Sequence, residues 1–171
     1  MKWKDKINAK SNIKITTIDV KTDKIIDIQY FKNLLTTDGY KTLQAWASGT
    51  APVDDPNYNV DTRITEFAVG DSNTAPDISQ TGLGNELLRK TVYPAVSADI
   101  GCGISKEDND KVVYTILIDS TELNGETIRE MGLFGSIFSP TIMLSRFLTG
   151  ELEKSSEVRF IIEYTYQFTN I

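Results

Sequence analysis

The chain of 171 residues contains no histidine and a single cysteine, Cys102. Histidine is the commonest general base and the commonest neutral metal ligand, so its absence excludes Ser-His-Asp and Cys-His catalysis. A zinc site needs several Cys and His ligands, which this chain lacks. One thiol also excludes an intrachain disulfide, which fits a protein that is made and folded in a cytoplasm. We therefore expect no catalytic residue, no cofactor and no metal.

Long apolar runs and a basic stripe are missing as well. No segment approaches the roughly 20 apolar residues of a transmembrane helix, and no apolar run follows the basic start Met1–Lys6, so we expect no secretory signal. The net charge is -6, from 18 Lys+Arg against 24 Asp+Glu. Lysine is dense only near the N-terminus. These features predict neither nucleic-acid binding nor membrane insertion.

What is present is the composition and periodicity of a β-rich globular protein. Hydrophobic residues make up 40% and charged residues 25% of the chain, which is ordinary for a soluble domain. Alternation of apolar and polar residues is typical of strands. It predicts seven or eight of them, over residues 12–20, 24–31, 64–69, 92–100, 111–119, 127–134, 142–148 and 158–168.

Two short helices are expected. Thr36–Asp38 is typical of a helix N-cap, and apolar residues then recur at helical spacing until Ser48-Gly49. The apolar face predicted for that helix consists of Tyr40, Leu43, Trp46 and Ala47. Leu83, Leu87 and Leu88 suggest a second helix around Asn85–Lys90, in which Glu86 and Arg89 would pair.

Strands outnumber helices and the connections are short, which favours a mainly β fold. We predict an antiparallel β-sandwich or barrel-like domain with one or two short helices and an N-terminal hairpin. The predicted division places an N-terminal arm and β-hairpin in residues 1–35 and a β domain in residues 36–171.

Several weak motifs have simpler explanations. Gly82–Leu87 lacks the last glycine and the βαβ context of a dinucleotide loop. Asp108 and Asp110 are spaced like the start of a calcium loop, but the required Gly and distal Glu are missing, so a solvated turn is expected. Asp71 is interpreted as the side-chain cap of a turn. Cys102, between two glycines that should break a strand, is expected to be a small core or loop residue.

Residues Thr127–Gly135 place charges inside an otherwise apolar strand. Ile128, Glu130, Gly132 and Phe134 should share one side, and Arg129, Met131 and Leu133 the other. A buried Glu130 would need a cationic partner, for which Arg89 and Arg146 are the candidates. The alternative is an edge strand with both charges exposed.

Two other function classes stay open at this point. Trp3, Trp46 and Tyr58 could stack on sugars in a carbohydrate-binding, and hence receptor-binding, module. Carboxylates near strand ends could serve a glycoside hydrolase, and the candidates are Glu66, Glu126 and Glu130. The expectation from composition is nonetheless that the chain is not an enzyme.

Five segments, in order, carry a family resemblance: 67–71, 83–89, 128–134, 143–146 and a closing strand to Phe168. Over roughly residues 36–168 the chain resembles the N-terminal domain of phage tail-collar and tail-fibre proteins and related baseplate attachment proteins. The resemblance implies a virion component of the tail, made in the host cytoplasm, that docks a fibre or tip protein. Because a fibrous shaft usually follows in the family and this chain stops at Ile171, we expect a connector.

The implied partners are other tail, baseplate or fibre proteins, and copies of the same chain in a trimer or hexamer. The hairpin of residues 12–31 and the loop Val53–Tyr58 are the expected docking contacts. The candidate structural or interaction residues are Glu86, Arg89, Glu130, Leu133, Phe134 and Arg146.

Overall fold

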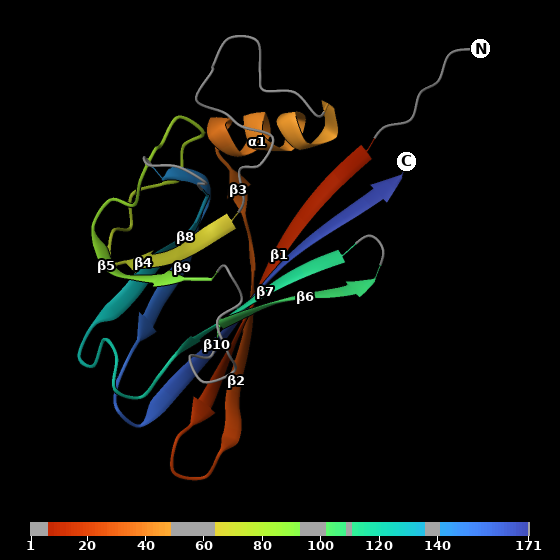
Figure 1. Cartoon of the computed structure of the whole chain (residues 1–171). Coiled ribbons are helices and arrows are strands. Elements are labelled where there is room, and N and C mark those ends of the chain that lie inside the picture. The colour runs from red at the N-terminus through yellow and green to blue at the C-terminus, as the bar shows by residue number, and fades with distance from the viewer. Residues whose placement is uncertain (1–6, 49–63, 93–101, 109–110, 136–140, 171) are drawn as a thin grey trace.

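The computed structural model describes residues 7–48, 64–92, 102–108, 111–135 and 141–170, which form two antiparallel sheets and one helix (Figure 1). The first sheet has the order β2 (Lys24–Lys32), β1 (Ile7–Asp19), β10 (Val158–Asn170), β7 (Lys111–Ile118), β6 (Cys102–Asp108). The second has the order β3 (Leu34–Leu35), β9 (Ile142–Glu153), β8 (Thr127–Gly135), β4 (Ile64–Gly70), β5 (Glu86–Thr91). The helix is α1 (Thr37–Ser48). No helix in the described part of the chain has the length and apolar character needed to cross a bilayer.

The N-terminal hairpin is confirmed as the pair β1 and β2. Asp19 closes its turn by accepting a 2.7 Å hydrogen bond from the backbone N–H of Thr22, and Asp23 takes the left-handed φ of 56°. On its other side β1 pairs with β10 from Ile7 to Asp19. The first sheet therefore joins strands from both sides of the division predicted at residue 35, and Figure 1 shows β1 and β10 side by side.

The hydrophobic core lies between the two sheets, and the predicted alternation of β10 produces one wall of it. Phe160, Ile162 and Tyr164 of β10 are buried. From the second sheet, the Phe147 ring lies 5.8 Å from the Tyr164 ring, and the Ser145 and Tyr164 hydroxyls are hydrogen-bonded at 2.7 Å. Facing apolar layers of two antiparallel sheets define a β-sandwich, so the predicted fold class is confirmed.

The first predicted helix exists, but its buried face is different. Thr36 is the N-cap, since its hydroxyl accepts the Gly39 N–H at 3.1 Å. Tyr40, predicted to face the core, is 58% exposed, whereas Gly39 and Thr42 are buried. A Cβ at Gly39 would lie 2.0 Å from the Leu144 carbonyl oxygen, so the missing side chain lets α1 approach β9 and fixes which face is buried. The side chains of Trp46 and Ala47 lie outside the described residues.

The second predicted helix is wrong, because residues 86–91 form strand β5 against β4. The register shifts where Val69 pairs with Leu88 and Gly70 with Glu86, which leaves Leu87 as a bulge. One extra residue reverses the alternation, so Glu86 and Arg89 share a face and still pair. The described residues thus hold ten strands and one helix, not seven or eight strands and two helices. The predicted strand over 92–100 lies almost entirely outside the described residues.

The two-faced pattern expected for β8 is only partly correct. Glu130 and Phe134 face away from the main core, while Met131 and Leu133 lie in it. Ile128, predicted to share the side of Glu130, also lies in the main core, because the register to β9 shifts between these two residues. β8 lies between β9 and β4, so the alternative of an exposed edge strand is wrong. Cys102 is the first residue of β6, and the segment just before it, where the predicted strand would end, lies outside the described residues.

Candidate functional site

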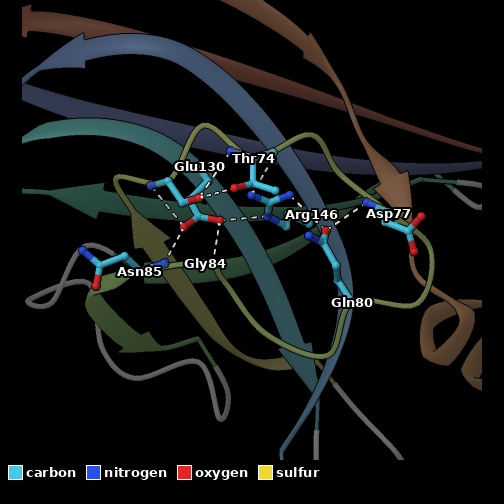
Figure 2. A network of polar contacts seen from close by, with 8 residues as sticks. Thr74, Asp77, Gln80, Gly84, Asn85, Glu130 and Arg146 are labelled. Carbon is cyan, nitrogen blue, oxygen red and sulfur yellow. Dashed lines mark hydrogen bonds and ion pairs between the residues drawn. The ribbon is translucent and has the colours of Figure 1, made fainter.

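The candidate site is the outer face of the second sheet, where the loop between β4 and β5, residues 71–85, covers the sheet (Figure 2). A small apolar cluster separate from the main core lies on that face. It consists of Ala68, Phe134 and Met143, with Leu83 of the loop packed on it. Because Leu83 is part of this cluster, we call residues 71–85 the covering loop.

Glu130 is the acceptor to which the covering loop is attached. Its side chain is 0% exposed. Oε1 accepts the backbone N–H groups of Asn85 at 3.0 Å and Ser72 at 3.3 Å, and Oε2 accepts that of Gly84 at 3.1 Å. A buried carboxylate requires partners of this kind. Here they come from both ends of the covering loop.

Arg146, on the neighbouring strand β9, supplies the opposite charge and is 1% exposed. Its Nε donates to Glu130 Oε2 at 2.8 Å. Its Nη1 donates to Gln80 Oε1 and its Nη2 to the Thr74 carbonyl oxygen, both at 2.9 Å. Of the two cationic partners predicted for Glu130, Arg146 is therefore the one that binds it. The pair attaches the middle of the covering loop as well as its ends.

The covering loop is also ordered by its own polar groups. A turn at residues 77–80 holds Gln80 in place, since the Asp77 N–H donates to Gln80 Oε1 at 2.9 Å. Hydrogen bonds from Ser79, its hydroxyl first, lower the pKa of Asp77. At the base of the loop, Asn85 Nδ2 donates to Asp71 Oδ1 at 2.7 Å. The sequence suggested that Asp71 caps its own turn. In the structure its side chain instead joins the two ends of the loop.

Gly70 makes the close approach of these groups sterically feasible. A Cβ there would lie 2.3 Å from the Asn85 carbonyl oxygen and 2.6 Å from Glu130 Oε1. Real Cβ atoms do not come that close to backbone oxygen, so only glycine fits between the carboxylate and the loop. By contrast, a Cβ at Gly82, in the same loop, would meet nothing within 4 Å.

Arg89, the other cation predicted as a partner of Glu130, belongs to a second and more exposed cluster. Its guanidinium is bound by Glu86 and, at 2.8 Å, by Glu66. Its Cζ lies 3.9 Å from the centre of the Phe134 ring, which is a cation–π geometry. Hydrogen bonding to Glu86 raises the pKa of Arg89 above its ordinary value. Arg89 therefore covers Phe134, and Phe134 in turn lies in the small apolar cluster.

Five of the six candidate residues thus meet on this face, in two neighbouring clusters: Glu130 with Arg146, and Glu86 with Arg89 and Phe134. Leu133 lies on the opposite side of β8, fully buried between the sheets. The sequence reasoning missed Gln80 and the carbonyl of Thr74. No pattern in the sequence marks Gln80, and a backbone carbonyl has no residue signature.

The carboxylates considered for hydrolysis are not assembled as a pair. Glu130 is enclosed by its four donors, Glu66 is bound to Arg89, and Glu126 lies exposed in the turn before β8. For sugar stacking, Trp3 and Tyr58 lie outside the described residues, as does the loop Val53–Tyr58. Among the described residues no group of three or more potential ligands is arranged to hold a metal ion. Asp110 of the calcium-like motif is not among them.

Comparisons of the chain with models of protein families, with curated proteins and with solved structures find no match.

Proposed function

We propose that the chain is a structural component of a phage or phage-like tail, acting as a baseplate or tail-fibre connector through protein–protein assembly. The proposal starts from the five sequence segments that resemble tail-collar and tail-fibre N-terminal domains. Four of them, residues 67–71, 83–89, 128–134 and 143–146, overlap with β4, β5, β8 and β9. These strands are consecutive neighbours in one sheet, in the order β9-β8-β4-β5.

The observation that carries the proposal is that these four segments converge on one ion pair. Glu130 and Arg146 come from two of them, and Gly84 and Asn85 of a third donate to Glu130. The segment 67–71 contributes Gly70, whose missing side chain leaves room for the carboxylate. These residues lie far apart in the chain but share one structural role, which is to hold the covering loop in place.

A fixed loop is useful to a protein that works by docking. A connector binds two partners, so its contact surfaces must keep one arrangement. A surface that is already ordered also loses less entropy on binding. The covering loop is also joined to the helix, since the Thr37 N–H donates to the Ile78 carbonyl oxygen at 2.7 Å. In the proposed assembly the chain forms a trimer or hexamer and contacts other tail proteins.

Mass spectrometry of purified particles tests the proposal. Particles produced by the genome that encodes the chain should contain it in several copies, at a constant ratio to the other tail proteins. Deletion of its gene should give particles that lack fibres or a complete baseplate. A chain that is absent from the particle, with normal tails in the deletion, would contradict the proposal.

A further inference from the structure

The exposed apolar residues of this protein are concentrated on one hairpin. In the part of the chain that the structure describes, seven large hydrophobic residues are exposed, and five of them belong to β1–β2 or its turn: Val20, Ile25, Ile26, Ile28 and Tyr30. Tyr30 is 73% and Ile28 is 42% exposed. Exposed apolar residues gathered on one segment in this way are typical of an interaction site.

The same hairpin forms one end of the first sheet. β2 is the terminal strand in the sheet order, and among the described residues β1 is its only hydrogen-bonded neighbour (Figure 1). From Asp27 to Lys32 it pairs with β1 without a register shift. The backbone N–H and C=O groups that point away from β1 can therefore bind another strand.

A row of paired residues continues from this edge onto the sheet. Ile28 pairs with Thr16 of β1, Thr16 with Ile161 of β10, and Ile161 with Leu117 of β7. Paired residues point to the same side of a sheet, so the four form one row across its outer face. Ile161 and Leu117 are partly exposed, whereas Thr16 is polar and buried. A strand added beside β2 would extend this row by one residue.

We propose that the free edge of β2 binds an extended segment of a partner protein as an additional antiparallel strand. The segment leaves Ile26 unpaired, as β1 does, so its apolar residues lie opposite Ile25, Ile28 and Tyr30, and acidic residues at its two ends face Lys24 and Lys32. Main-chain hydrogen bonds would supply affinity, and the alternate side chains specificity. This inference rests on the proposed connector function, because it names the kind of segment through which another tail protein would attach.

Charge decides between a partner and a second copy of this chain. With Ile26 unpaired, two copies pairing symmetrically about Ile28 would set Lys24 against the apolar Phe31 at both ends. Pairing about Asp27 would set Asp27 against itself, and pairing about Gln29 would set Asp27 and Lys32 against apolar side chains. Like charges directly opposite one another destabilise a strand pair, and lysine on an edge is a known means of preventing self-pairing. An acidic-ended segment avoids each of these conflicts.

A fluorescent peptide tests the proposal on the isolated full chain. The peptide Glu-Thr-Val-Thr-Val-Lys-Val-Glu leaves Ile26 unpaired and places Glu opposite both lysines, Val opposite Ile25, Ile28 and Tyr30, and Lys opposite Asp27. We expect its anisotropy to rise on binding and the amides of β2 to become protected from hydrogen exchange. A control peptide with Lys at both ends should bind about tenfold or more weakly, and added salt should weaken the binding of the first peptide.

Two variants provide a matched control on the protein side. Ile28→Lys adds a charge in the middle of the edge and should weaken peptide binding about tenfold or more. Ile78→Lys makes the same change at a residue that is 53% exposed in the covering loop, and should leave binding unchanged. Both sites are exposed, and circular dichroism checks that both variants fold.

Three results would overturn the proposal: equal binding of the two peptides, β2 amides that stay unprotected, or a concentration-dependent dimer that protects β2. The last result would make the occupant a second copy. These outcomes are independent of the proposed function, because peptide binding is measured without the particle. A chain that binds the peptide but is absent from the particle would contradict the connector function alone.

Discussion

The Glu130 carboxylate and the Arg146 guanidinium lie 2.8 Å apart on neighbouring strands, and their side chains are 0% and 1% exposed. Together they accept or donate hydrogen bonds at five places along the covering loop: Ser72, Thr74, Gln80, Gly84 and Asn85. A buried ion pair is costly to form and is weak support for stability by itself. Its role here is to attach one loop to one sheet in a single arrangement.

Glu130→Gln should strongly destabilise the fold. Gln keeps the size of Glu but removes the charge that Arg146 needs, and its amide NH₂ would face backbone N–H donors. Loss of one partner of a buried pair typically costs about 3–5 kcal/mol. We expect a decrease of this size in the free energy of unfolding, measured by urea denaturation at pH 7.

The control uses an ion pair that joins the same two strands at the surface. Arg129 of β8 binds Glu151 of β9 at 3.1 Å, and the Glu151 side chain is 71% exposed. Arg129→Gln should cost no more than about 1 kcal/mol, since exposed pairs contribute little. Equal effects of the Glu130 and Arg129 substitutions would contradict the role assigned to the buried pair.

Gly70→Ala should destabilise the protein by about 1–3 kcal/mol, the usual cost of forcing extra atoms into a packed site. The added methyl group would collide with the Asn85 carbonyl oxygen and with Glu130. Thermal unfolding followed by circular dichroism measures the effect. Gly82→Ala is the matched control in the same loop, where a methyl group meets open space. A loss of stability for Gly82→Ala as large as that for Gly70→Ala would refute this steric explanation.

Arg89→Lys should cost about 1 kcal/mol although the charge is kept. Lysine cannot reproduce the forked contact with Glu86 together with the contact to Glu66, and an ammonium lacks the planar face that lies over Phe134. Urea denaturation provides the measurement. An unchanged midpoint would mean that the charge of Arg89 matters and its geometry does not.

Stability should fall steeply at alkaline pH because of a tyrosine cluster between the sheets. Burial raises the pKa of Tyr114 from 10.0 to about 12 and raises that of Tyr164 and Tyr166 in the same direction. Because folding raises the pKa of these hydroxyls, the fold keeps its full stability below pH 10, the pKa of an unfolded tyrosine. Stability is lost as the pH rises from there through the pKa of the folded state. For Tyr114 alone the loss is about 2–3 kcal/mol.

Urea denaturation at pH 8 and at pH 11.5, with tyrosinate absorbance at 295 nm, checks this prediction. Tyr114→Phe removes one ionisable hydroxyl and should reduce the alkaline loss relative to the unchanged chain. Stability that is constant up to pH 11.5 would show that these hydroxyls ionise freely in the folded protein.

Most of the fold could be predicted from the sequence because β-strand alternation survives in the packed structure. The side of β10 with Phe160, Ile162 and Tyr164 was predicted correctly, since both its polar and its apolar faces are regular. Residues 86–91 were not, because Leu87 is a bulge and a bulge breaks the period on which the prediction depends. Tyr40 was misplaced since Gly39, with no side chain, was not recognised as the contact point of the helix.

The candidate site could be predicted only at its charged centre. A charge inside an apolar strand is unusual, so Glu130 and a short set of cationic partners could be identified from the residues. The remaining contacts of Glu130 are backbone N–H groups of the covering loop. Every residue type has such a group, and the loop conformation that aims them at one carboxylate depends on the tertiary structure.

Cryo-electron microscopy of the assembled particle tests the central claim, that this chain is a tail connector, most directly. We expect the β-sandwich in several symmetry-related copies at the junction of the tail with its baseplate or fibres, in contact with at least two other proteins. The edge of β2 should lie beside a strand from one of them. Density for the chain only at the distal tip, with a free β2 edge and a single protein neighbour, or no density for it at all, would contradict the claim.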